Sequence, residues 1–219
     1  MQRNITIEEV RAEYVSLMGS DLGRLCYELQ DDLEWLRYKW GEFLELFGKG
    51  PDRIELFSKV ASNFFYFLQK LLYEDAMLHL CRLTDPPGNR CQENLTLLRL
   101  AKLIPEQEFS AQVRKDAEEV RKKCEFARKW RNKRLAHTDL MSLRNERASP
   151  LPSVTSQDVE GVLESMRALL NSVEQHYDIP PSALAHDPFG ATSLVHFLEQ
   201  VVRARENGDH RWIELDGHA

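Results

Sequence analysis

The sequence predicts an all-α protein, an up-and-down bundle of long helices with a short extra helix near the C-terminus. Apolar residues recur at spacings of three and four in several long segments, the pattern of an amphipathic helix. No segment shows the sustained polar–apolar alternation of a half-buried strand. Helices this long bury their apolar stripes only against one another, and an up-and-down bundle achieves this economically.

Capping and turn signals set the expected helix boundaries. Thr6 and Glu9 have the spacing of a capping box, so a helix is expected to begin there, and Gly19 and Gly23 are expected to break or bend it. The further segments expected to be helical are residues 20–47, 52–84, 95–103, 108 into the segment 129–140, 156–176 and 193–206. The sequences DPPGN (85–89) and RNERASPLPSV (144–154) are expected to be loops. We expect a helical bundle over 1–177 and a C-terminal helical extension and tail over 178–219.

The composition favours a globular protein of the cytoplasm without a bound cofactor. Hydrophobic residues make up 42% and charged residues 29%, and the net charge of −6 gives no global basic excess. The four cysteines form neither a C-x-x-C pair nor a Cys/His cluster with zinc spacing, so we expect reduced, mostly buried thiols and no metal site. The N-terminus lacks the apolar core of a signal peptide, and the most apolar stretch, FFYFLQKLLY, is too short to span a membrane.

One segment departs from the acidic average. Between Arg114 and Arg134 there are ten cations and four acids, and the cations become denser toward the end of the expected helix. Cations at a helix C-terminus complement the macrodipole, which is the ordinary explanation. The alternative, a surface that binds phosphate groups, is favoured because a solvated helix usually mixes its charges. The residues expected to bind RNA are Arg128, Lys129, Lys133 and Arg134.

The sequence KWRNKRLAHTDL, residues 129–140, places Arg131 and His137 six positions apart with Asn132 after the arginine. A guanidinium suits a phosphate, and an imidazole exchanges protons near neutral pH. Together they would support metal-free RNA cleavage, in which the imidazole takes the proton of a ribose 2′-OH and the guanidinium stabilises the phosphoryl oxygens. The pattern R-x(4–6)-H occurs four times in the chain, but the other three matches lie in the charged tail.

Helix geometry limits this interpretation. Positions six apart lie about 120° apart around an α-helix and about 9 Å along it. Either the helix ends or loosens near Leu135, or the site is assembled between two chains. A two-fold homodimer would also supply the second histidine that the reaction needs as an acid.

The chain resembles the HEPN superfamily, whose mark is R-x(4–6)-H, and within it the abortive-infection AbiU-like branch. The segments that carry the resemblance extend in order from Met18 to about Leu140: MGSDLGRLCYEL, LRYKWGEFLELFG, DRIELF, FFYFLQKLLYEDAMLHLCRLTDPP and RNKRLAHTDL. The resemblance implies an all-α bundle that forms a two-fold dimer, with Arg131, Asn132 and His137 as catalytic residues of a shared groove. Some members have a tyrosine two residues after the histidine that a partner enzyme modifies; here Asp139 occupies that position, so this control is not supported.

Two functions from different classes therefore remain. The first is a metal-independent endoribonuclease in phage defence or a toxin–antitoxin system, with a possible antitoxin protein as partner. The second is a non-catalytic helical dimerisation module that binds RNA or a protein. Other conspicuous residues are expected to be structural: His79 in the core, Arg82 and Asp85 paired with each other or capping their helix, and Phe64, Phe65, Tyr66 and Phe67 in the core rather than stacked on bases.

Overall fold

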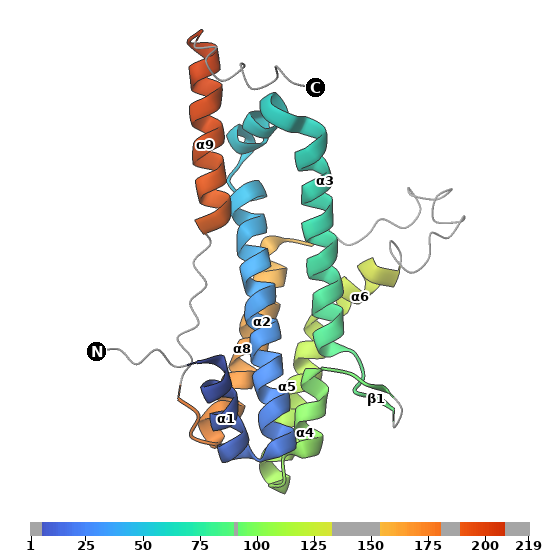
Figure 1. Cartoon of the computed structure of the whole chain (residues 1–219). Helices are drawn as coiled ribbons and strands as arrows, with labels where there is room; N and C mark the ends of the chain where they lie inside the picture. The colour runs from blue at the N-terminus through green and yellow to red at the C-terminus, as the bar shows by residue number, and fades with distance from the viewer. Residues whose placement is uncertain (1–5, 90–91, 133–153, 181–188, 209–219) are drawn as a thin grey trace. The chain divides into compact units, whose positions relative to one another are not determined.

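The structure is a computed structural model that describes residues 6–89, 92–132, 154–180 and 189–208 (Figure 1). The chain forms two compact units, Met1–Arg37 with Met77–Leu184 and Tyr38–Ala76 with Ala185–Ala219, so that the helices α2 and α3 each contribute to both. The described elements are α1 (Ile7–Met18), α2 (Ser20–Phe47), α3 (Pro51–Thr84), β1 (Gly88–Asn89), β2 (Gln92–Glu93), the 3-10 helix η1 (Leu97–Arg99), α4 (Leu100–Leu103), α5 (Gln107–Lys123), α6 (Glu125–Arg131), α8 (Ser156–His176) and α9 (Phe189–Glu206).

The predicted all-α class is confirmed. In the described ranges, the only strands are the two-residue segments β1 and β2, which pair antiparallel within and just after DPPGN. Gly88, with φ of 85°, supplies the left-handed backbone conformation in this turn. All but the last residue of RNERASPLPSV lies outside the described residues, so its assignment as a loop stays a prediction.

The boundary between α1 and α2 shows why its two glycines differ. The Thr6 capping box is confirmed: Thr6 N donates to Glu9 Oε2 at 2.7 Å, and Glu9 N donates to Thr6 Oγ1 at 3.2 Å. Gly19, with φ of 81°, ends α1 as expected. The expected break at Gly23 is wrong, because Gly23 lies inside α2. A Cβ atom on Gly23 would lie only 2.4 Å from the carbonyl oxygen of Tyr14, so this glycine permits close packing of α1 on α2.

The first unit is built around α5 and α8, which pack against each other, with α4 packed on α5. The apolar faces of α5 and α8 are buried, whereas Arg114 and Lys115 on α5 are exposed. Tyr14 of α1 and Glu174 of α8 are both buried, and the Tyr14 hydroxyl donates to Glu174 Oε1 at 2.5 Å. This hydrogen bond satisfies two polar groups that would otherwise be costly to bury.

The predicted single helix from residue 108 into the 129–140 segment is wrong, because the backbone leaves helical geometry at Cys124. There φ is −79° and ψ is 5°, and the helix is divided into α5 and α6. The Arg128 guanidinium donates through Nη2 to the carbonyl oxygen of Arg121 at the end of α5. A side chain of α6 thus satisfies a carbonyl group in the last turn of α5.

The second unit has a hydrophobic core of its own, formed by five buried residues. These are Leu46, Phe57, Phe65, Ala191 and Val195. The rings of Phe57 and Phe65 stack with centroids 3.9 Å apart, and α3 is interrupted between them at Ala61, whose φ of −157° and ψ of 68° are not helical. At the start of α9, Glu42 Oε2 accepts a hydrogen bond from Ala191 N at 2.6 Å, a favourable place for a carboxylate.

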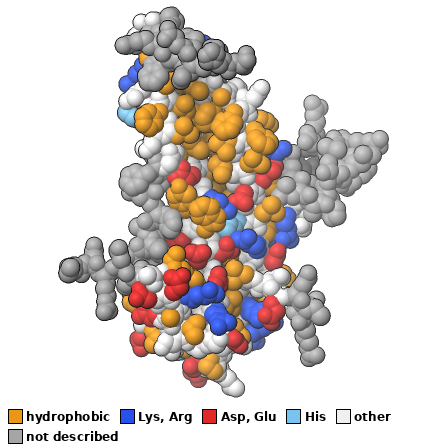
Figure 2. Space-filling model, viewed as in Figure 1, with side chains coloured by type: hydrophobic (Ala, Val, Ile, Leu, Met, Phe, Trp, Pro, Cys, Tyr) orange, Lys and Arg blue, Asp and Glu red, His pale blue; other side chains and the backbone are white. Residues whose placement is uncertain are grey.

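The prediction that four consecutive aromatic residues of α3 belong to the core is wrong for three of them. Phe65 is buried, but Phe64, Tyr66 and Phe67 are 58%, 71% and 58% exposed. Successive residues of a helix point about 100° apart, so four in a row cannot all face one core. Figure 2 shows apolar side chains gathered on the visible face of this unit.

Candidate active site

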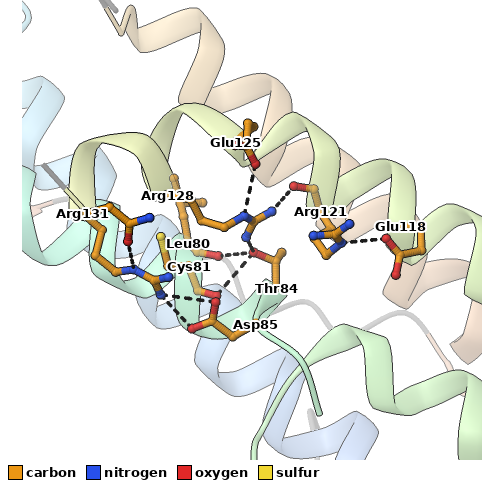
Figure 3. A network of polar contacts seen from close by, with 10 residues as sticks. Leu80, Cys81, Thr84, Asp85, Glu118, Arg121, Glu125, Arg128 and Arg131 are labelled. Carbon is orange, nitrogen blue, oxygen red and sulfur yellow. Dashed lines mark hydrogen bonds and ion pairs between the residues drawn. The ribbon is translucent and has the colours of Figure 1, made fainter. Parts of the chain in front are cut away.

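The predicted motif begins at the end of α6, where Arg131 is bound by the acidic residue that follows α3. Arg131 Nη1 donates to Asp85 Oδ2 at 2.9 Å and to Asp85 Oδ1 at 3.2 Å (Figure 3). The Arg131 side chain is 28% exposed and that of Asp85 is 30% exposed. The guanidinium is therefore partly exposed and is oriented by the Asp85 carboxylate.

One turn earlier, a second arginine joins the same two helices. Arg128 Nη1 donates to Thr84 Oγ1 at 2.8 Å, Nη2 donates to the Arg121 carbonyl, and Nε lies 3.5 Å from Glu125 Oε2. The Arg128 side chain is only 13% exposed. These contacts give Arg128 a structural role in joining α6 to the end of α3, whatever it contributes to RNA binding.

The remaining predicted residues differ in how far the structure describes them. Asn132 is exposed, and its Oδ1 accepts a hydrogen bond from Arg131 Nε at 3.4 Å. Lys129 is exposed on α6. Lys133, Arg134 and the motif histidine, His137, lie outside the described residues, and so does Leu135, where the helix was expected to end or loosen. Their roles stay predictions.

Two buried thiols lie beneath this surface. Burial raises the pKa of Cys124 to about 12, although its hydrogen bond with Thr84 and the nearby Arg128 charge oppose the shift. Burial also raises the pKa of Cys81, against the opposing charges of Arg131 and Arg128. Both thiols therefore stay protonated at neutral pH, which makes them poor nucleophiles. The expectation of reduced, buried cysteines is confirmed for Cys26, Cys81 and Cys124, while Cys91 is not described.

Arg82 and Asp85 do not form the pair that the sequence suggested. Arg82 Nη2 binds both oxygens of Asp32 on α2, at 2.5 and 2.7 Å, whereas Asp85 binds Arg131. The reason is that each side chain finds an oppositely charged group on another helix. Asp85 is therefore the site residue that sequence reasoning assigned elsewhere, and its position next to the helix end gave no indication of a partner 46 residues away.

His79 is a satisfied core histidine, as predicted. It is 4% exposed, and its Nε2 lies 3.1 Å from Asp32 Oδ2. Burial alone would raise the pKa of Asp32, but the hydrogen bond and charge of His79, together with Arg82, lower it overall. The Asp32 carboxylate is thus held in its charged form between α2 and α3.

Neither a metal cluster nor a membrane helix occurs in the part of the chain that the structure describes. No group of three or more His, Cys, Asp or Glu side chains is placed there to hold a metal ion. No helix within the same ranges has both the length and the apolar character needed to cross a bilayer. Among the other pattern matches, Arg203 and Arg205 are exposed on α9, and the histidines that follow them are not described.

Comparison with known families supports the resemblance read from the sequence. A family model described as AbiU2, within the HEPN group, matches residues 19–189. No curated protein and no solved structure gives a significant match to this chain. The matched span covers most of the chain and contains α2 to α8, together with Asp85 and the whole 129–140 segment. The chain therefore belongs to the AbiU2 family of HEPN proteins.

Proposed function

We propose that this protein is a metal-independent endoribonuclease whose catalytic residues are Arg131, Asn132 and His137. The observation that carries the proposal is the placement of Arg131: it lies at the end of α6, partly exposed and held by Asp85, in a chain that belongs to a HEPN family. A fixed, accessible guanidinium is suited to stabilise a phosphoryl group without rearrangement during the reaction.

The reaction needs a base, an acid and a group that stabilises negative charge. The His137 imidazole takes the proton of a ribose 2′-OH, and the 2′-oxygen forms a bond to the adjacent phosphorus. The bond from phosphorus to the 5′-oxygen breaks, and that oxygen receives a proton from a second imidazole. In a two-fold dimer the partner subunit's His137 supplies this proton, while Arg131 stabilises the charge on the phosphoryl oxygens. The products are a 2′,3′-cyclic phosphate and a 5′-hydroxyl.

The basic residues around the motif bind the RNA backbone in this proposal. Lys129 is the exposed cation nearest Arg131 in the described part of α6, and Lys133 and Arg134 follow in the sequence. Contacts with phosphate groups make binding depend on salt rather than on base sequence. Arg128 belongs to the same basic segment, but its protein contacts make it chiefly a support for α6.

Membership of the AbiU2 family supports a proposal for the biological setting. We propose that the enzyme acts in the cytoplasm in phage defence or in a toxin–antitoxin system, with RNA as substrate and a small antitoxin protein as its regulator. A nuclease that attacks cellular RNA requires such control, and Asp139 replaces the tyrosine through which some HEPN toxins are modified. Control by direct binding of a protein is the form that this sequence leaves open.

The proposal is tested with purified protein and matched RNA and DNA oligonucleotides. We expect RNA cleavage to persist in EDTA and to leave a 2′,3′-cyclic phosphate, and DNA to remain intact because it lacks the 2′-hydroxyl. His137→Ala should abolish cleavage, and Arg131→Ala should lower the rate by roughly 10²-fold or more, as for loss of one transition-state donor. Arg205→Ala, in the competing pattern match on α9, should have no effect.

The alternative is a dimeric module that binds RNA or a protein without catalysis. The tie between Arg131 and Asp85 is compatible with it, because an ion pair can also serve only to hold two helices together. Protein that binds RNA but cuts none in the presence or absence of divalent ions would establish this alternative and refute the nuclease.

A further inference from the structure

Asp85 is held more firmly than an ordinary residue after a helix. Thr96, which is fully buried, donates its hydroxyl to the carbonyl oxygen of Asp85 at 2.7 Å and to that of Leu83 at 3.1 Å. One residue earlier, Thr84 donates to the Leu80 carbonyl at 2.8 Å and accepts from Arg128. The backbone that carries the Asp85 carboxylate is therefore fixed from both sides, and so is the α6 helix that carries Arg131.

The three nitrogen atoms of the Arg131 guanidinium are used unequally. Nη1 donates to both oxygens of Asp85, and Nε donates to Asn132 Oδ1 at the longer distance of 3.4 Å (Figure 3). Within residues 6–89, 92–132, 154–180 and 189–208, no acceptor takes a hydrogen bond from Nη2. Two of the three nitrogens are thus occupied by described residues, and Nη2 belongs to a side chain that is 28% exposed.

We propose that Asp85 is a positioning residue of the nuclease, which holds Nη1 so that Nη2 of Arg131 meets the phosphoryl oxygens of the scissile phosphate. This inference rests on the proposed function and deepens it. Asp85 has a second effect of opposite sign, because its negative charge offsets that of Arg131 and repels the incoming phosphate. The carboxylate therefore weakens RNA binding while it improves the orientation of the group that stabilises the transition state.

These opposed effects distinguish positioning from a merely structural tie. Asp85→Asn keeps an oxygen that can accept from Nη1 but removes the negative charge. We expect its KM for RNA to fall about threefold, because a repulsive charge near the phosphate is gone. We expect its kcat to fall about tenfold, because the guanidinium is held less rigidly. Asp85→Ala removes the acceptor as well and should lower kcat further, with a similar fall in KM.

A structural tie would behave differently. Loss of packing between α3 and α6 would lower the melting temperature and reduce kcat without improving binding. The matched control is Asp75→Asn, which makes the same charge change on α3, the helix that Asp85 follows, but disrupts the ion pair with Lys39 in the second unit. It should leave both kinetic constants unchanged. An Asp85→Asn variant with unchanged or raised KM, or with unchanged kcat, overturns the inference.

Two measurements keep this result separate from the fate of the proposed function. The first is binding of a 2′-O-methyl oligoribonucleotide, which cannot be cut, and which Asp85→Asn should bind about threefold more tightly with a steeper salt dependence. The second is the NMR signal of the Arg131 Nε–Hε group, assigned by its loss in Arg131→Lys. This signal should be narrow and distinct in the wild type and should broaden or merge with those of solvated arginines in Asp85→Ala.

If the wild-type protein cuts no RNA, the nuclease proposal fails, and these two measurements still decide whether Asp85 orients Arg131 toward a phosphate. Tighter binding in Asp85→Asn together with a mobile Arg131 in Asp85→Ala supports that role in a protein that only binds RNA. Unchanged binding, or an Arg131 signal that Asp85→Ala leaves unaltered, overturns it in either case.

Discussion

Arg128 and Arg131 lie about one helical turn apart but differ in burial and in their hydrogen-bond partners. Arg128 is 13% exposed and donates to Thr84 and to a backbone carbonyl, whereas Arg131 is 28% exposed and binds a carboxylate at the surface. A largely buried guanidinium that joins three helical segments contributes to stability, and a more exposed guanidinium suits a ligand. The sequence alone gives both residues the same basic character.

This difference predicts distinct effects of substitution on the first unit. Arg128→Ala should lower the free energy of unfolding by about 2 kcal/mol, because Thr84 and the Arg121 carbonyl lose hydrogen bonds from a charged group. Lys129→Ala, at the next and exposed position, should change it by less than about 0.5 kcal/mol and should instead weaken RNA binding. Urea denaturation followed by circular dichroism measures the first quantity. Equal stability of the two variants would contradict the structural role of Arg128.

The polar side of the candidate site was only partly predictable at the residue level. The motif and its basic surroundings predict Arg131, Asn132 and His137 as site residues. The partner of Arg131 is not, because Asp85 lies 46 residues away in sequence and three residues from another arginine, Arg82. Local spacing favoured the nearer pair. In the structure Arg82 instead binds Asp32 on α2, and Asp85 binds Arg131 on α6.

At the level of helices, local signals predicted most boundaries and missed the interruptions. The capping box at Thr6 and the glycine at position 19 act through the backbone of their own segment. The sequence therefore predicts where α1 begins and ends. The break at Cys124 and the kink at Ala61 involve neither glycine nor proline. At Cys124 the guanidinium of Arg128 bonds to Thr84 and to the Arg121 carbonyl, contacts that no local pattern contains, whereas the kink at Ala61 has no structural explanation.

Two helical glycines of the first unit provide a matched test of packing between helices. Gly23 on α2 faces the backbone of α1, and a Cβ there would lie 2.4 Å from the Tyr14 oxygen and 2.8 Å from the Val15 Cα. Gly161 on α8 has no atom within 4 Å of the same position. We expect Gly23→Ala to destabilise the protein by about 1–3 kcal/mol, because α1 must move away from α2. Gly161→Ala should stabilise it by about 0.5–1 kcal/mol, because alanine favours the helix.

Thermal and urea unfolding of the two variants measure these opposite shifts. The comparison is internally controlled, since each substitution adds one methyl group to a glycine inside a helix of the same unit. Stabilisation by Gly23→Ala would show that α1 does not pack on α2 as closely as described.

On the scale of the whole molecule, helical periodicity predicted the fold class but did not predict which apolar residues are exposed at the surface. Apolar spacing predicts long helices that pack together, and the described chain has them. The same spacing does not tell which apolar residues face inward. In α3, Phe65 is buried and the adjacent Phe64 is 58% exposed, although both have the composition of a core residue. Which apolar face of a helix is buried depends on how the helices pack, and the apolar spacing within one helix does not determine this.

The active enzyme is expected to contain two chains. One motif offers a single histidine, while the reaction needs both a base and an acid, so we expect the competent species to be a two-fold dimer with His137 from each subunit in one groove. Mixed dimers, formed by co-expressing wild-type protein with His137→Ala, should then be inactive. Cleavage should follow the square of the wild-type fraction, so that an equal mixture retains about a quarter of the activity.

Subunits that work alone give a different result from the same mixture. Their activity would fall in proportion to the wild-type fraction, to about half at equal mixing. Arg205→Ala serves as the control partner, because a subunit with an intact motif should leave mixed dimers fully active. Light scattering on the same samples relates activity to assembly: a monomer at micromolar concentration that still cleaves RNA would refute the shared groove, because each chain would then have to supply both acid and base by itself.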